Sequence, residues 1–253
     1  MPITVDAIYR YPVKGLSAQK LDHVAVRAGE MLPFDRAYAL ALAATPFDPA
    51  NPQHLPKTNF LMLMRDEKLA ALQTAFEPET KTLTIVRNGK RVARGRLDDA
   101  MGRAVIEQFF AAYLGGVARG QPRLVSAPNH NFSDARNKVV SIVNLASVKD
   151  FERVAGAPVH PLRFRGNLYI AGAAPWAEQG WVGKEIGIGK LRLKIEKSID
   201  RCAATHVNPE TAERDLNVVP ALQRGYGHIN MGVYGRVLAD GEIARGDELT
   251  PPS

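Results

Sequence analysis

The sequence predicts an α+β fold dominated by strands, in which a mixed N-terminal half precedes a β-rich half that forms a barrel. Two observations support this fold class. Helical periodicity is strong in few segments, with residues 98–114 the clearest, while many short apolar runs are separated by Gly and Asn turns. Most of these short runs follow residue 137, and many short strands in succession favour a closed β structure.

The N-terminal half combines a hairpin with helices. Asn88-Gly89 separates two strand-like runs, and both central positions of a type I′ turn need positive φ. Residues 98–114 are apolar at helical spacing and end at Gly115-Gly116. Residues 45–56 contain four prolines and should form an exposed loop. The other expected elements are strands at 3–11, 22–27, 36–42, 82–87 and 90–96, and a short helix at 66–76.

Residues 115–137 are rich in Gly, Pro, Asn and Ser and are the best candidate for a boundary. We therefore expect an N-terminal domain at residues 1–118 and a barrel domain at 119–253. Asn144 is a suitable N-cap for a helix at 145–154. The strands expected in this half are 138–143, 168–171, 185–188, 190–197, 229–237 and 248–249.

The composition excludes several classes of protein. A single cysteine among 253 residues cannot form an internal disulfide or hold an iron–sulfur cluster through four cysteines of the chain. The six histidines are scattered, without the short spacing of structural zinc sites. No run is long and apolar enough for a signal peptide or a membrane span, so we expect a cytoplasmic protein without a membrane partner.

The net charge of +7 favours an anionic partner, although a solvated basic surface explains the charge equally simply. The basic residues are dispersed and are not interleaved with aromatic residues, as base stacking would require. We therefore expect no nucleic-acid partner.

Cys202, the only cysteine, follows directly on a predicted strand and lies in a polar segment at 198–215. Free cysteines are commonly buried as small hydrophobic residues. Here Asp200, Arg201, Thr205 and His206 surround the thiol, and a guanidinium favours the thiolate form. Spacing alone leaves a nucleophile and a metal ligand about equally favoured.

Several motifs resemble one known family. The run from Arg201 to Asp215, Arg-Cys-x-x-Thr-x-Val-x-Pro-x-Thr-x-x-Arg-Asp, resembles the signature of the MOSC domain, named for the C-terminal region of molybdenum cofactor sulfurases. Tyr-Pro-Val-Lys-Gly at 11–15 resembles the start of the β-barrel-type domain that accompanies MOSC. Phe-Arg-Gly-Asn at 164–167 and the runs at 230–235 and 241–249 resemble later motifs of the family, in the same order.

The resemblance implies a molybdenum cofactor, bound through its pterin, with Cys202 as the ligand of molybdenum. Thiolate is a soft ligand and suits such a metal. Three positions depart from the usual pattern of the family: Gly15, Asp200 and Ala212. The residues that the resemblance places around the cofactor and its phosphate are Lys14, Arg36, Ser147, Arg165, Asn167, Arg201 and Thr205.

The relatives include the amidoxime-reducing component and bacterial hydroxylaminopurine reductases. They imply an oxidoreductase that reduces N-hydroxylated compounds of the hydroxylaminopurine or amidoxime type. Because Cys202 is the only cysteine, the electrons should come from a separate ferredoxin- or cytochrome b5-like protein. The alternative is a non-catalytic carrier of molybdenum cofactor or of sulfur, with a persulfide on Cys202. A third possibility is a cofactor-free barrel that binds another anion.

Overall fold

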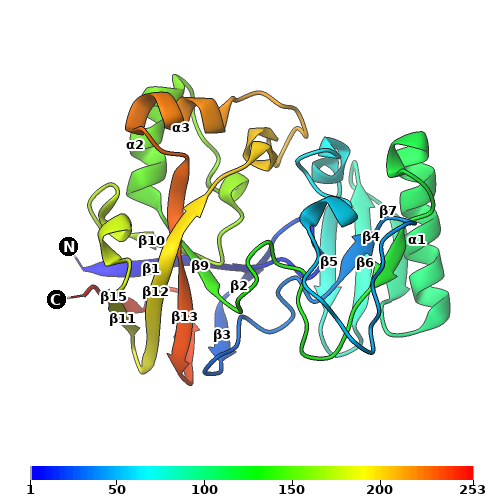
Figure 1. Cartoon of the computed structure of the whole chain (residues 1–253), viewed down its shortest axis with the longest axis horizontal. Coiled ribbons are helices and arrows are strands. Elements are labelled where there is room, and N and C mark those ends of the chain that lie inside the picture. Colours follow the sequence, from blue (N-terminus) through cyan, green and yellow to red (C-terminus); the bar gives the residue numbers. More distant parts are fainter. Residues whose placement is uncertain (1, 253) are drawn as a thin grey trace.

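Strands from both ends of the chain close into a barrel (Figure 1). The computed structural model describes residues 2–252. The barrel strands are β1 (Ile3–Arg10), β9 (Val140–Asn144), β10 (Leu168–Ala171), β11 (Glu185–Ile188), β12 (Leu191–Asp200), β13 (Asn230–Ala239) and β15 (Glu248–Thr250). They are joined in the order β10-β9-β13-β12-β11-β15-β1, and β1 pairs back with β10. Closure removes the open edges that a flat sheet exposes.

The barrel core follows from alternation along the strands. In β12, Leu191, Leu193 and Ile195 are fully buried, and polar side chains lie between them. Three short strands lie outside the ring. β2 (Gln19–Leu21) pairs with β1, and β3 (His23–Val26) pairs with β14 (Gly241–Ala244).

The middle of the chain forms a second, smaller unit, on the right in Figure 1. Strands β5 (Gln73–Glu77), β6 (Thr82–Arg87) and β7 (Lys90–Arg96) form an antiparallel sheet, and α1 (Ala100–Leu114) packs against it. A further pair, β4 (Ala39–Ala41) and β8 (Arg123–Val125), completes this unit.

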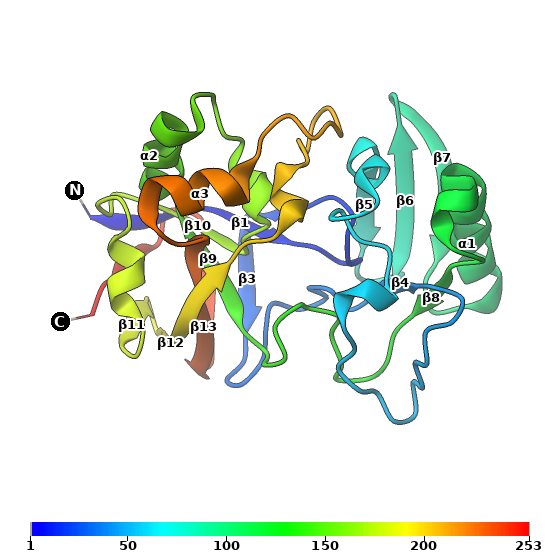
Figure 2. The ribbon, with the colours of Figure 1, turned by 45° about the horizontal axis from the view of Figure 1, so that its top comes forward.

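Two helices cover one end of the barrel. They are α2 (Leu145–Ala155) and α3 (Val218–Tyr226), which lie side by side in Figure 2 and share a core around Phe151 and Leu222. The remaining helical segments are short 3₁₀ turns: Lys57–Asn59, Glu67–Ala71, Gly115–Ala118, Pro161–Phe164, Ala177–Trp181 and Ala203–His206. Within residues 2–252, every helix is too short or too polar to cross a lipid bilayer.

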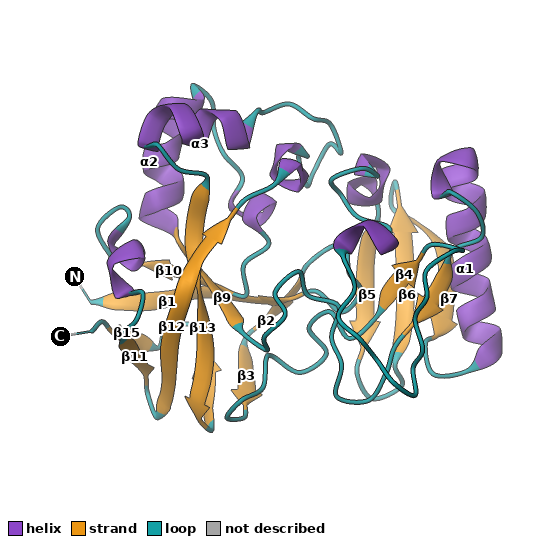
Figure 3. Ribbon diagram, viewed as in Figure 1, coloured by secondary structure: helices purple, strands orange, loops and turns teal. Residues whose placement is uncertain are grey.

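The predicted strand-dominated α+β fold with a C-terminal barrel is confirmed (Figure 3). The hairpin turn has positive φ at both Asn88 and Gly89, at 51° and 73°. Asp99 caps α1 by accepting a hydrogen bond from the amide of Gly102, and Asn144 caps α2 through the amide of Ala146. These local signals predicted the elements because each satisfies backbone groups near its own position in the sequence.

One element prediction was wrong, and one helix was not predicted. The helix expected at 66–76 is instead a 3₁₀ turn followed by β5, because Phe76 pairs with Leu83 of β6 and the amide of Thr74 donates to Ser17. Helix α3 was missed, since Pro220 and Gly225 lie within it and its apolar face is short.

The two cores do not follow chain order. Val5, Ile8 and Val26 come from the first 30 residues but belong to the barrel core, whereas β8 pairs with β4 in the smaller unit. The chain therefore leaves the barrel after β3, builds the smaller unit and returns at β9. The division at residues 118 and 119 stays a prediction about units that fold independently.

Candidate functional site

A cavity of about 560 Å³ lies between the barrel and the smaller unit. This volume is within the range of pockets that bind small organic ligands. Seven Lys or Arg side chains line it against three aspartates, so the cavity is strongly basic. The cations are Lys14, Arg36, Lys57, Arg163, Arg165, Lys197 and Arg201, and the aspartates are Asp35, Asp134 and Asp200.

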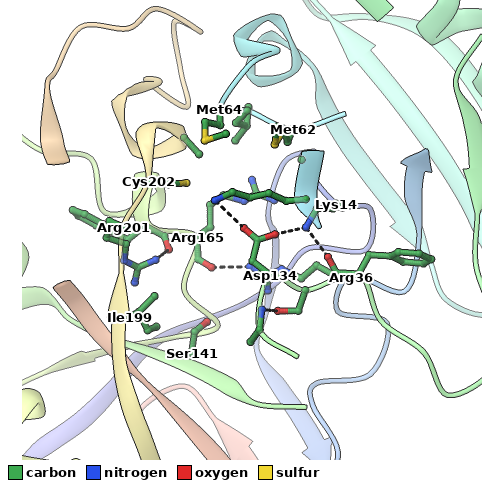
Figure 4. A pocket seen from close by; sticks show the side chains of 18 of the residues that line it. Lys14, Arg36, Met62, Met64, Asp134, Ser141, Arg165, Ile199, Arg201 and Cys202 are labelled. Atoms are coloured by element: carbon green, nitrogen blue, oxygen red, sulfur yellow. Dashed lines mark hydrogen bonds and ion pairs between the residues drawn. The ribbon is translucent and has the colours of Figure 1, made fainter. Parts of the chain in front are cut away.

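Cys202 follows directly on β12 and directs its sulfur into the cavity (Figure 4). It is partly exposed, and it is the residue before a short 3₁₀ turn. The amide and the hydroxyl of Thr205 both donate to the carbonyl oxygen of Cys202, at 3.0 and 2.9 Å. Thr205 therefore fixes the backbone from which the thiol projects.

Arg201 holds the end of β12 in place. Its Nε donates to the carbonyl oxygen of Met231 at 2.9 Å, and Nη1 donates to that of Phe164 at 2.7 Å. Burial lowers the pKa of Arg201 from its ordinary value. The guanidinium is thus bound to backbone carbonyls, and it ties β12 to β13 and to the segment that carries Arg165.

Arg36 and Arg165 both lie against the ring of Tyr11. Their guanidinium carbons are 4.4 and 4.2 Å from the centre of its ring, a cation–π distance for both. Both arginines have a left-handed backbone, with φ of 50° and 49°, and Nη2 of Arg36 donates to the carbonyl oxygen of Arg165 at 2.9 Å. Asp35 neutralises Arg36 through an ion pair of 2.5 Å.

Arg165, in contrast, has no carboxylate partner within the described part of the chain. Its Nη1 donates to the carbonyl oxygen of Leu16 at 2.8 Å. Burial, reinforced by the neighbouring Arg36, lowers the pKa of Arg165 to about 10, and the Tyr11 ring only partly opposes this. A cation held in this state is stabilised by any anion that enters the cavity.

Lys14 and Asn167 complete the basic side of the cavity. Burial lowers the pKa of Lys14, and its ammonium donates to Asp134 and, at 2.7 Å, to the carbonyl oxygen of Phe132. Asn167 accepts from the hydroxyl of Ser141 at 2.8 Å and donates to the carbonyl oxygen of Tyr9 at 3.1 Å. Asn167 therefore acts here as a link between β1 and β9.

The structure brings together seven of the eight residues that the sequence placed at the site. These are Lys14, Arg36, Arg165, Asn167, Arg201, Cys202 and Thr205. Ser147 is not among them. It is fully buried in α2, where its hydroxyl bonds Glu178 at 2.9 Å and accepts from the amide of Trp176 at 2.8 Å. Ser147 thus supports the helix layer and does not line the cavity.

Lys57 and Asp134 also line the cavity, although the sequence did not mark them as site residues. Burial alone would lower the pKa of Lys57, but its interactions with Cys202 and Asp134 outweigh this effect and raise that pKa. Asp134 lies 3.9 Å from Lys57 and also pairs with Lys14. No local sequence pattern marks either residue, so only the folded chain places them in the cavity.

Arg163 anchors the segment that carries Cys202. Its guanidinium donates to the carbonyl oxygen of His206 at 2.9 Å and to both carboxylate oxygens of Asp215 at 2.5 and 2.7 Å. Nε of Arg163 is buried and has no partner within residues 2–252. The same segment contains Ala212 with a φ of 61°, a conformation that glycine adopts more readily.

The donor set fits a soft metal that brings its own ligands better than an all-protein metal site. Residues 2–252 contain no cluster of three or more His, Cys, Asp or Glu side chains that could hold an ion. Cys202 offers one sulfur ligand, and the cations of the cavity offer donors to a phosphate. A phosphorylated cofactor with a metal of its own matches both features.

Comparisons with known proteins point to one family. A model described as the MOSC domain matches residues 128–250. The chain is 31% identical over 122 residues to a protein named molybdenum cofactor sulfurase from Drosophila willistoni, a match that covers 46% of this chain and 15% of that protein. The chain therefore spans a small part of this curated relative.

Two solved structures are also similar. The YUAD protein from Bacillus subtilis has 13% sequence identity and a TM-score of 0.46, covering 98% of this chain and 94% of that one. YiiM from Geobacillus stearothermophilus has 19% identity and a TM-score of 0.33, covering 45% of this chain and 54% of that one.

Proposed function

Because residues 128–250 of the chain match the MOSC domain, we propose that the protein binds molybdenum cofactor in the cavity and reduces N-hydroxylated compounds. One observation carries the proposal. The only thiol of the chain lies in the same cavity as Arg165, a partly exposed cation without a carboxylate partner in residues 2–252. A ligand with a thiophilic metal at one end and a phosphate at the other satisfies both groups.

Each residue of the cavity has a distinct proposed role in binding the cofactor. Cys202 is the proposed thiolate ligand of molybdenum, and Arg165, Lys14 and Arg36 are the proposed partners of the phosphate. Arg201 and Thr205 keep the thiol in position, and Asn167 keeps the basic segment in position. When bound, the cofactor supplies a metal centre that accepts and delivers two electrons.

The proposed reaction cleaves an N–O bond. The substrate R–NHOH takes up two electrons and two protons, and the amine R–NH₂ and one water molecule leave. The electrons come from a separate redox protein of the ferredoxin or cytochrome b5 type. The net charge of +7 suits an acidic protein of this kind, because complementary charge accelerates encounter.

Metal analysis of wild type and Cys202→Ala tests the proposal. Both proteins are expressed in a host that makes the cofactor, and molybdenum content and pterin fluorescence are measured. We expect stoichiometric molybdenum in the wild type and its loss in the variant, with similar free energies of unfolding once both proteins are free of cofactor. Wild-type protein that reduces 6-hydroxylaminopurine with a reduced dye is an enzyme. A wild type free of molybdenum would contradict the proposal.

A carrier function is the second candidate, and the similarity to a sulfurase favours it. In this case Cys202 accepts a sulfane sulfur from a donor persulfide by thiol exchange and passes it on. The distinguishing result is a persulfide on Cys202, detected by mass spectrometry after incubation with a persulfide donor, in a protein that contains no molybdenum and reduces no N-hydroxylated compound.

A further inference from the structure

The cavity is divided into a basic side and an apolar side. Met62, Leu63 and Met64 line it from the smaller unit. In Figure 4, Met62 and Met64 lie at the top of the cavity, with Met64 on the side of Cys202 and Met62 on the side of Lys14, whereas Arg36, Arg165 and Ser141 lie below. A phosphate bound to the arginines leaves the space beside the methionines for another group.

The turn that carries the methionines is held rigidly by its own unit. Asp66, which is 2% exposed, accepts a hydrogen bond from the amide of Met62 at 2.9 Å. Its carboxylate is held in turn by Arg119 at 3.0 and 3.1 Å. The carbonyl oxygen of Met62 accepts from the amides of Arg65 and Asp66. The turn is therefore preorganised and does not need to order when a ligand binds.

A side chain of the barrel side, Arg214, also binds this turn. Arg214 donates to the carbonyl oxygens of Leu63 and Met64 at 3.2 and 2.8 Å, and it forms an ion pair of 3.1 Å with Glu67. The same guanidinium donates to the carbonyl oxygen of Ala203, the residue after Cys202, at 3.2 Å. One side chain thus fixes the methionine turn relative to the thiol.

We propose that Met62 and Met64 select the substrate: they bind the flat, uncharged aromatic ring that carries the N-hydroxyl group. This inference rests on the proposed function and names its substrate class. Thioether sulfur is polarisable and makes favourable contacts with aromatic rings. A charged or strongly hydrated substituent placed against the methionines would lose its bound water without gaining a hydrogen-bond partner. Aromatic N-hydroxylated compounds are therefore preferred to small aliphatic ones.

Substrate pairs test the proposal. The holoenzyme with reduced dye is assayed on benzamidoxime and on acetamidoxime, which share the reacting group and differ in the ring. We expect Met62→Ala/Met64→Ala to lower kcat/KM for benzamidoxime roughly tenfold, mainly through KM. The value for acetamidoxime should stay within about twofold. Met101→Ala is the matched control, because Met101 is 80% exposed on α1 and does not line the cavity.

The proposal is overturned if the ratio of kcat/KM for benzamidoxime to kcat/KM for acetamidoxime is the same in the variant as in the wild type. Met64→Ala alone, at a partly exposed position, is used if the double variant does not fold. Calorimetric binding of adenine, an uncharged aromatic ring, gives a second readout that needs no turnover, and we expect weaker binding by the methionine variant. If the wild type reduces neither amidoxime, the proposed function fails. Adenine binding then tests the role of Met62 and Met64 by itself, and an unchanged affinity of the methionine variant for adenine overturns that role.

Discussion

Arg163 and Asp215 show how single side chains hold the reactive segment in position. Arg163 is 4% exposed, so its charge needs the carboxylate of Asp215 and the carbonyl oxygen of His206. Burial alone would raise the pKa of Asp215, but the hydrogen bonds from Arg163 and Asn208 outweigh it and hold that pKa below its usual value. The pair therefore links the stability of the Cys202 segment to pH.

We expect Asp215→Asn to lower the free energy of unfolding at pH 7 by about 1 kcal/mol, a modest value because the side chain is 36% exposed. A carboxylate with a lowered folded pKa stabilises above its unfolded pKa, near about 4, and loses this effect as pH falls through the folded pKa. The difference from wild type should therefore shrink below about pH 4. Urea unfolding at several pH values measures it.

Glu213→Gln, at an exposed position in the same segment, is the control and should change the free energy of unfolding at pH 7 by less than about 0.5 kcal/mol. A constant gap between wild type and Asp215→Asn from pH 7 to pH 3 would contradict the assignment.

At this scale the sequence predicted the site only where residues lie in recognisable motifs. Cys202, Arg165 and Lys14 were found in this way and line one cavity. No local sequence pattern marks Lys57 or Met64. Their role depends on the approach of the smaller unit to the barrel, which no short pattern encodes. Ser147 does not line the cavity, because its hydroxyl donates a hydrogen bond to the buried side chain of Glu178.

Among the elements, α1 and β7 depend on a pair of glycines. A Cβ added at Gly102 would come within 2.2 Å of the carbonyl oxygen of Arg96, and one at Gly95 within 2.4 Å of that of Gly102. Helix and strand therefore touch through their backbones, which brings Ile106 and Phe110 into the core. Glycine has a lower helix propensity than alanine, but at position 102 it allows this backbone contact.

Gly102→Ala should therefore destabilise the protein by about 1–3 kcal/mol, although alanine favours helix. The backbone oxygen cannot move away without displacing β7. Gly116→Ala, where a Cβ meets nothing within 4 Å, should change stability little. Thermal unfolding of both variants tests this. A stabilised Gly102→Ala protein would mean that the helix and the strand are not in backbone contact.

Elements with local caps and turns were predictable, and elements defined by tertiary pairing were not. The caps Asp99 and Asn144 and the Asn88-Gly89 turn all function as expected. In residues 66–76, Leu69, Leu72 and Phe76 repeat at helical spacing, yet pairing with β6 draws the second part into a strand. Tertiary hydrogen bonds outweighed a weak helical preference there.

For the whole molecule, Arg214 is a link between the barrel and the smaller unit. Because it is solvent-exposed, Arg214→Ala should change the free energy of unfolding by less than about 1 kcal/mol. The loss of its bonds to Leu63 and Met64 should nevertheless loosen the methionine turn. We expect faster hydrogen exchange in residues 62–67 and faster alkylation of Cys202.

Mass spectrometry after exchange and after iodoacetamide treatment measures both effects. Arg224→Ala, an exposed arginine of α3, is the control. Unchanged exchange in residues 62–67 would show that the turn is held by Asp66 and Arg119 alone.

The position of β1 in the ring has a consequence for synthesis of the protein. β1 leaves the ribosome before its partners β10 and β15, and its residue Ile3 lies opposite Leu249. At cellular rates of translation, the strand waits roughly 10–50 seconds for the last of these partners. During that time Val5 and Ile8, fully buried in the finished barrel, remain available to chaperones and to other nascent chains.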